Sequence, residues 1–218
     1  MRIRTKPWAK KELEECSFYI NNPEINKGKW NEYFNNGNPI HMELGCGKGN
    51  FIAELAPQNL NINYIAVDMI EAMLGLAKRN IENSYKEKYI EKINNLALVR
   101  QNIERIDMML DKTDIIDRIY INFCNPWPRG KHNKRRLTHT RQLEKYKVFL
   151  RKGAEIHFKT DDDTLFESSI KYFENSGFEI LELTYDLHNE NIEENIETEH
   201  ERMFSEQGIK IKRLVAKI

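Results

Sequence analysis

The chain has 218 residues, 40% of them hydrophobic, and its 34 lysines and arginines balance 34 aspartates and glutamates. A chain of this length buries about 70% of the surface of its unfolded form, so it needs no disulfide or structural metal to fold. No segment approaches the ~20 apolar residues of a membrane-spanning helix, and the start of the chain lacks the apolar core of a signal peptide. We therefore expect a protein that binds no membrane. The three cysteines have no paired spacing, so we also expect a cytoplasmic protein that binds no metal. A net charge of zero disfavours a nucleic-acid partner only if the charges are evenly spread.

The predicted elements alternate between short apolar strands and helices. Residues 1–39 form a polar arm with a basic cluster at its start and a predicted helix over 13–19. We expect residues 40–218 to form one domain. The predicted strands cover residues 40–44, 64–68, 96–100, 119–123, 155–159, 178–184 and 209–217. The predicted helices cover residues 50–56, 71–84, 104–110, 140–150, 165–175 and 202–207.

This alternation predicts an α/β fold with a doubly wound, mostly parallel sheet of seven strands. The first five strands are joined through helices, as parallel neighbours require. After residue 175 no long crossover helix is predicted, so the last strands can pair antiparallel. We therefore expect an antiparallel C-terminal strand.

A glycine-rich loop lies between the first predicted strand and the helix after it. Gly45, Gly47 and Gly49 allow positive φ and let a ligand approach the backbone closely. Their G-x-G-x-G spacing differs from the dinucleotide fingerprint G-x-G-x-x-G, which disfavours a nicotinamide oxidoreductase. Glu43 precedes the loop, where a carboxylate would repel a pyrophosphate but could bind the ammonium of an amino-acid group. Asp68 ends the second strand, where a carboxylate can bind both ribose hydroxyls of an adenosine.

Together these features resemble the S-adenosylmethionine site of Rossmann-like methyltransferases. The alternative is a glycine turn beside a solvated Asp68. Asn102, just after the third strand, is a further candidate because its amide can hydrogen-bond the edge of adenine. A simple turn residue is the alternative at that position.

The fourth predicted strand runs into Asn125-Pro126-Trp127-Pro128. Each proline restricts the residue before it, so we expect rigid, extended backbone at Asn125 and Trp127. A basic run follows, and it consists of Arg129, Lys131, His132, Lys134, Arg135 and Arg136. A run of this kind is typical of a phosphate-binding surface, and a solvated loop is the alternative.

With these motifs, the sequence resembles bacterial tRNA (guanine-N7)-methyltransferases, which methylate guanosine 46 in the variable loop. The matching stretches are residues 43–49, 120–136, 157–161 and 186–201. The resemblance implies a Rossmann-like fold, S-adenosylmethionine as the cofactor and tRNA as the partner. Monomer and homodimer both stay open.

The resemblance also assigns the candidate residues to three groups. The cofactor would contact Glu43, Gly45, Gly47, Gly49, Asp68, Asn102 and Asn125. The guanosine would contact Arg129, Asp161, Thr198, Glu199 and Glu201. The RNA would contact Lys131, His132, Lys134, Arg135 and Arg136.

Two residues depart from the usual pattern of this family: Asn125 replaces an aspartate and Arg129 replaces a lysine. Asn125 is the candidate catalytic residue. Guanine N7 carries an in-plane lone pair, so displacement at a methyl group needs no general base. A carboxylate would help chiefly by offsetting the positive charge that develops on the ring. Asn125 can orient by hydrogen bonding but cannot supply that charge, whereas Arg129 keeps the cation with a different geometry.

The acidic segment near the C-terminus has two interpretations. Thr198 and Glu201 have the spacing of a helix capping box, which does not need Glu199. Guanine, in turn, presents two adjacent donors, N1–H and N2–H₂, and one carboxylate can accept both. Asp161, with Glu199 and Glu201, would therefore select guanine over adenine.

The zero net charge is the sum of opposed segments. Residues 125–160 hold eleven basic and two acidic residues, whereas residues 161–207 hold fifteen acidic and two basic ones. A basic face for RNA and an acidic wall for guanine fit methylation of tRNA at guanine N7. Two other functions stay open. Asn125 suggests a tRNA-binding protein on this scaffold with weakened or lost catalysis, and the Asn-Pro turn suggests an N6-adenine nucleic-acid methyltransferase.

Overall fold

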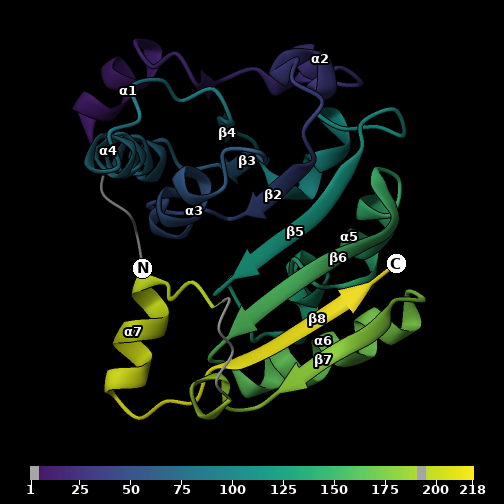
Figure 1. Ribbon diagram of the computed structural model, residues 1–218. Helices are drawn as coiled ribbons and strands as arrows, with labels where there is room; N and C mark the ends of the chain where they lie inside the picture. Colours follow the sequence, from purple (N-terminus) through teal and green to yellow (C-terminus); the bar gives the residue numbers. More distant parts are fainter. Residues whose placement is uncertain (1–4, 191–194) are drawn as a thin grey trace. The chain divides into compact units, whose positions relative to one another are not determined.

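The computed structural model describes residues 5–190 and 195–218, and their side chains except that of Glu199. The chain forms two compact units, of which one ends at Asp114 and the other begins at Ile115 (Figure 1). Both units contain strands and helices, which confirms the predicted α/β class. Within the described residues, no helix combines the length and the apolar character needed to cross a membrane.

The described strands of the first unit pair in parallel, in the order β1-β4-β3-β2. They are β1 (Tyr19–Ile20), β2 (Ile40–Leu44), β3 (Asn63–Asp68) and β4 (Leu96–Arg100). The α-helices are α1 (Pro7–Glu14), α2 (Trp30–Phe34), α3 (Asn50–Leu55) and α4 (Glu71–Glu87). The 3-10 helices are η1 (Pro23–Asn26), η2 (Ala56–Gln58) and η3 (Ile103–Met108). Every residue of β2 is buried, as expected for a parallel strand covered on both faces.

The N-terminal helix lies earlier than predicted. α1 begins at Pro7, whose fixed φ suits the first position of a helix, whereas the predicted helix over 13–19 is not formed. The segment Tyr19–Ile20 is instead strand β1 and pairs with β4, which adds an eighth strand to the seven predicted. These N-terminal elements belong to the first unit, which ends at Asp114.

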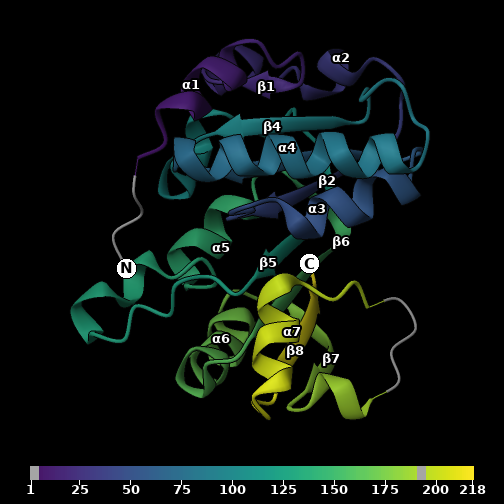
Figure 2. The ribbon, with the colours of Figure 1, turned by 90° about the vertical axis from the view of Figure 1, so that its left-hand side faces the viewer.

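Helix α1 packs closely against α4. A Cβ atom placed on Gly75 would lie only 2.5 Å from the Cβ of Ala9, so the approach of the two helices requires glycine at this position. Beside this contact, the guanidinium of Arg79 lies 3.6 Å from the ring centroid of Trp8. Helix α4 packs in turn on β3 and β4, and Figure 2 shows it beside β4. The N-terminal segment is thereby attached to the strands of its unit through α4.

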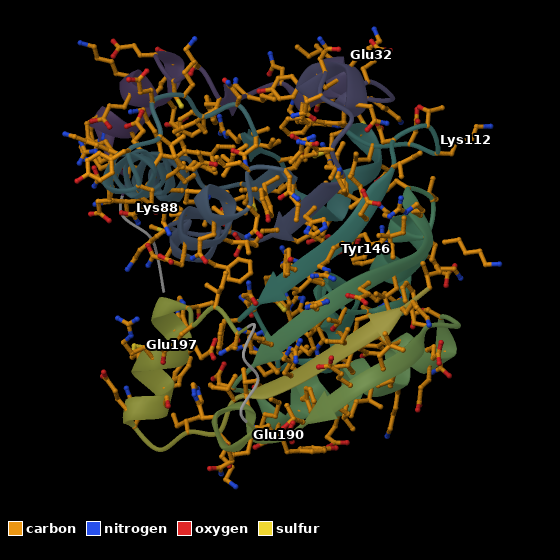
Figure 3. All side chains as sticks on the ribbon, in the orientation of Figure 1. Glu32, Lys88, Lys112, Tyr146, Glu190 and Glu197 are labelled. Carbon is orange, nitrogen blue, oxygen red and sulfur yellow. The ribbon has the colours of Figure 1, made fainter. Side chains whose placement is uncertain are left out.

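In the second unit, β5 pairs in parallel with β6, and β8 pairs antiparallel with both β6 and β7. The strands are β5 (Ile116–Asn122), β6 (Leu150–Thr160), β7 (Glu179–Thr184) and β8 (Lys212–Lys217). The helices are α5 (Thr140–Tyr146), α6 (Asp163–Asn175), α7 (Glu199–Glu206) and the 3-10 helices η4 (Gly130–Arg135) and η5 (Leu187–Asn189). The predicted antiparallel C-terminal strand is confirmed. Tyr146 at the end of α5 is fully buried in the core of this unit, whereas Glu190 is exposed (Figure 3).

A buried carboxylate attaches the segment before β2 to the end of the first unit. Asp114 accepts the N–H of Trp30 at 3.2 Å on Oδ1, and the N–H groups of Gly28 at 2.8 Å and Asp111 at 3.0 Å on Oδ2. Trp30 is fully buried, and its indole N–H donates to the carbonyl of Met109 at 2.8 Å. Three backbone donors therefore depend on one side chain.

We expect the substitution Asp114→Asn to lower the free energy of unfolding by about 2 kcal/mol, because the new amide would turn an N–H donor toward backbone N–H groups. Urea denaturation followed by circular dichroism measures this change. Glu32→Gln is the control, since Glu32 is an exposed acid in α2 and its loss should cost less than about 0.5 kcal/mol. An equally small effect in both variants would contradict the anchoring role of Asp114.

Candidate active site

The glycine loop follows β2 directly and has the backbone conformation that its sequence predicts. The φ angles are 83° at Gly45, 53° at Gly47 and 70° at Gly49, in the region that favours glycine. A Cβ on Gly49 would lie 2.7 Å from the Cβ of Ala77, so this glycine also permits close packing against α4. A Cβ on Gly47 would meet no atom within 4 Å. The backbone at Gly47 is therefore open to a ligand on that side.

Asp68 closes the loop against the end of β3. Its Oδ2 accepts the N–H of Gly47 at 3.0 Å, and its Oδ1 accepts the N–H of Ile70 at 2.8 Å. Burial raises the pKa of this carboxyl, and the backbone hydrogen bonds oppose the rise. Each carboxylate oxygen has a second lone pair, so Asp68 can hold the loop and still accept a hydroxyl of a ligand.

Glu43 is buried in β2, just before the loop. Burial raises the pKa of the Cys46 thiol well above its usual range, and the nearby carboxylates of Glu43 and Asp68 add to the rise. The thiol therefore stays protonated and packs as a small residue. Glu43 and Asp68 thus act on the same side chain, which indicates that the two predicted cofactor contacts lie at one end of the first unit.

Asn102 lines a polar pocket of about 340 Å³. Its Oδ1 caps η3 by accepting the N–H of Glu104 at 3.0 Å. The other lining residues are Asn21, Asn22, Glu24, Met69, Arg100 and Gln101. Asn21, Asn22 and Glu24 come from the N-terminal segment, whose polar sequence predicts only a loop, so sequence reasoning missed them. The pairing of β1 with β4 and the hydrogen bond between Gln101 and Glu24 bring them beside Asn102.

The turn after β5 has an unusual backbone. Phe123 and Trp127 have φ angles of 49° and 44°, which are rare for bulky residues and store conformational strain. The extended conformation predicted for Trp127 is therefore wrong. The Oδ1 of Asn125 accepts the N–H of Trp127 at 3.0 Å, and the Nε of Arg136 donates to the carbonyl of Pro126 at 2.7 Å. These two hydrogen bonds hold the turn in a conformation that the residue before a proline does not favour.

The basic run differs from its prediction at one residue. Arg129, Lys131, Lys134 and Arg135 are exposed, and His132 is half-buried. The guanidinium of Arg135 lies 3.9 Å from the ring centroid of Trp127. Arg136, in contrast, is only 2% exposed and supports the turn from within, so it does not lie on the exposed face expected to meet RNA. The sequence reveals its charge but not its burial.

The candidate guanosine-binding residues other than Arg129 lie in two segments, and a lysine binds each of them. Asp161 follows the last residue of β6, and the ammonium of Lys212 donates to its carbonyl at 2.8 Å. Thr198 caps α7 by accepting the N–H of Glu201 at 3.0 Å, and the Thr198 N–H in turn donates to the Glu201 carboxylate at 3.4 Å. The predicted capping box is thereby confirmed. Glu199 is the first residue of α7, and its side chain lies outside the described ones.

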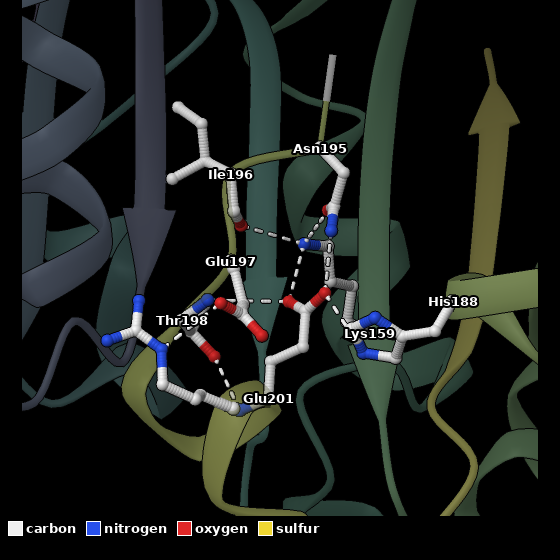
Figure 4. A network of polar contacts seen from close by, with 8 residues as sticks. Lys159, His188, Asn195, Ile196, Glu197, Thr198 and Glu201 are labelled. Carbon is white, nitrogen blue, oxygen red and sulfur yellow. Dashed lines mark hydrogen bonds and ion pairs between the residues drawn. The ribbon is translucent and has the colours of Figure 1, made fainter. Parts of the chain in front are cut away.

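Glu201 is fully buried in a network that sequence reasoning missed (Figure 4). Lys159 in β6 forms an ion pair with Glu201, with 2.9 Å between Nζ and Oε2. The amide of Asn195 donates to Oε1 at 2.6 Å. The available signal in the sequence was a lysine at the end of the fifth predicted strand, because a lysine that is buried there needs a partner for its charge.

The predicted contacts fall into two sets. The candidate cofactor residues other than Asn125 lie in the first unit. Asn125, together with the candidate guanosine and RNA residues, lies in the second unit. Among the residues that the structure describes, no group of three or more His, Cys, Asp or Glu side chains is placed to hold a metal ion.

Known proteins resemble this chain over nearly its whole length. A family model described as "Putative methyltransferase" matches residues 37–214. A tRNA (guanine-N(7)-)-methyltransferase of Clostridium botulinum (strain Alaska E43 / Type E3) is 62% identical over 99% of this chain and 98% of its own length. A protein of the same name from Clostridium perfringens (strain 13 / Type A) is 59% identical over 100% of this chain and 99% of its own length.

Solved structures resemble the chain in fold. The crystal structure of the 16S rRNA methyltransferase KamB has a TM-score of 0.63 at 14% identity and covers 87% of this chain and 92% of that chain. At this identity the likeness concerns the fold alone, which is that of methyltransferases. The two sequence relatives and the family model together place the chain more narrowly: it belongs to the tRNA (guanine-N(7)-)-methyltransferase family.

Proposed function

We propose that this protein transfers a methyl group from S-adenosylmethionine to N7 of guanosine at position 46 of tRNA. The observation that carries the proposal is the 62% identity, over nearly the whole chain, with a protein named for methylation of guanine N7 in tRNA. We further propose that it acts in the cytoplasm as a monomer or homodimer. The scaffold with lost catalysis and the N6-adenine enzyme are not favoured, since the matched relatives are named for neither.

The first unit has groups that fit S-adenosylmethionine. The open backbone at Gly47 offers space for a ligand, and Asp68 beside it retains acceptor capacity for ribose hydroxyls. Glu43 supplies a buried carboxylate for the ammonium, and Asn102 supplies an amide at the polar pocket for the adenine edge. Bound there, the cofactor supplies a methyl group that its sulfonium makes electrophilic.

The reaction that we propose needs no proton transfer. The N7 lone pair forms a bond to the methyl carbon, the carbon–sulfur bond breaks, and its electron pair stays on sulfur as a thioether. Positive charge thereby moves from sulfur to the guanine ring. The contribution expected of the protein is orientation and electrostatic stabilisation.

The role that we propose for Asn125 is to orient the reacting groups by hydrogen bonding, without contributing charge. Its Oδ1 is engaged with the Trp127 N–H, which keeps the turn after β5 in its strained form. Recognition of guanine is proposed for Arg129, Asp161, Thr198, Glu199 and Glu201. The carboxylates of Asp161, Glu199 and Glu201 suit the N1–H and N2–H₂ donors of guanine, a pair of donors that adenine lacks. The exposed members of the basic run would bind RNA phosphates.

We expect the purified protein to incorporate labelled methyl groups into unmodified tRNA and to yield N7-methylguanosine on nucleoside analysis. The control is the same tRNA with adenosine at position 46, which should accept no label. Label in N6-methyladenosine, or none in any nucleoside, would refute the proposed reaction.

We expect Asn125→Asp to raise kcat by up to about tenfold, which corresponds to ~1.4 kcal/mol of transition-state stabilisation. The carboxylate would still accept the Trp127 N–H and would also offset the positive charge on the methylated ring. Single-turnover methylation of tRNA measures the change, and Asn125→Ala, which loses the turn hydrogen bond, should be slower than the wild type. If the wild type is inactive and Asn125→Asp creates activity, the chain is instead an RNA-binding scaffold that has lost catalysis.

We expect replacement of Lys131, Lys134 and Arg135 by alanine to weaken tRNA binding and to reduce the slope of log K against log salt by about two, because fewer counterions are released. The matched control removes three exposed lysines of the first unit, Lys86, Lys88 and Lys92. Filter binding at several salt concentrations measures both slopes. Equal slopes in the two triple variants would show that the run is only a solvated loop.

A further inference from the structure

The start of α7 is held by a buried lysine. Lys159 is 6% exposed and lies near the carboxyl end of β6. Its ammonium pairs with Glu201, donates to the carbonyl of Ile196 at 3.0 Å, and contacts Oδ1 of Asn195 (Figure 4). An ammonium has three N–H donors, and these three acceptors match them. All three donors of the Lys159 ammonium are therefore used by α7 and the segment that leads into it.

Both carboxylate oxygens of Glu201 are also engaged by neighbouring groups. Its Oε2 receives Lys159 and the Thr198 N–H, and its Oε1 receives the Asn195 amide and faces the His188 ring at 3.7 Å. The side chain is 0% exposed. To accept the donors of guanine, the carboxylate would have to leave the ammonium of Lys159 buried and unpaired, which is strongly unfavourable.

A second contact holds α7 at the end of β5. The Phe123 ring stacks on the His200 ring with 5.8 Å between centroids, and it lies 6.0 Å from the Phe204 ring. Phe123 lies two residues before Asn125 and has a left-handed backbone. The helix is thus attached to the turn that carries Asn125 as well as to the strand that leads into Asp161.

We infer that Lys159 and Glu201 act as a positioning pair that holds α7 in place, while Asp161 and Glu199 are the carboxylates that read the donor edge of guanine. This inference rests on the proposed function and changes the role of Glu201 within it. Lys159 is the second-last residue of β6, two residues before Asp161, which follows the strand, and Glu199 begins the helix that the pair anchors. The pair therefore supports both segments that carry the reading carboxylates.

The test uses tRNA with guanosine or inosine at position 46, because inosine lacks the 2-amino group but keeps N7. Glu201→Gln should lower kcat/KM for both tRNAs by a similar factor, about tenfold, and should leave the preference for guanosine intact. Asp161→Asn or Glu199→Gln should abolish that preference. The inference is overturned if Glu201→Gln alone abolishes it, or if the wild type methylates both tRNAs equally well.

The pair itself is tested by a double-mutant cycle. Lys159→Met and Glu201→Met should each lower kcat/KM for tRNA and the melting temperature, and the double variant should be no worse than either single variant. Lys159→Arg should restore part of the activity, and the affinity for S-adenosylhomocysteine should not change. If the losses of the two single variants add up in the double variant, the two residues do not act as a unit and the inference is overturned. A wild type that methylates no tRNA would instead refute the proposed function, and the cycle in melting temperature would still report on the pair.

Discussion

Parallel pairing of strands is the constraint on which the candidate site depends. Neighbouring parallel strands end at the same edge of a sheet, so the residues that follow these strands lie close together. In the first unit, β2 and β3 lead into the glycine loop and Asp68, and β4 leads into Asn102. In the second unit, β5 and β6 lead into the turn at Asn125 and into Asp161. Each unit thus gathers polar groups at the ends of buried strands.

The features that sequence could predict are those determined by residues close together in the chain. The glycine loop needs positive φ at alternate positions, and only glycine adopts it at low cost. The capping box of Thr198 and Glu201 needs only one helical turn. The order of strands and helices follows from alternation of apolar runs. Each of these properties is local, which is why the predicted fold class and the loop agree with the structure.

The features that sequence could not predict depend on partners distant in the chain. Lys159 and Glu201 are 42 residues apart, and nothing near either one reveals that they pair. β1 is too short to be recognised from its own two residues, and it forms because β4 offers a free edge. Arg136 has the charge of its neighbours in the basic run, but its hydrogen bond to Pro126 requires the folded turn. Neither the net charge nor the spacing of the charged residues shows which of them are buried in the folded chain.

The left-handed backbone at Phe123 has a consequence for protein engineering. Phe123 has a φ of 49°, and its ring contacts the His200 and Phe204 rings of α7, so the helix that carries Glu199 is supported by an aromatic residue of the turn after β5. Grafting residues 195–206 onto a different methyltransferase scaffold would therefore not transfer the guanine recognition that we propose for this segment. The graft would also need an aromatic residue in the same backbone conformation, and the lysine that pairs with Glu201. The segment proposed to recognise guanine is continuous in the sequence, but the residues that support it, Lys159 and Phe123, are distant in the chain.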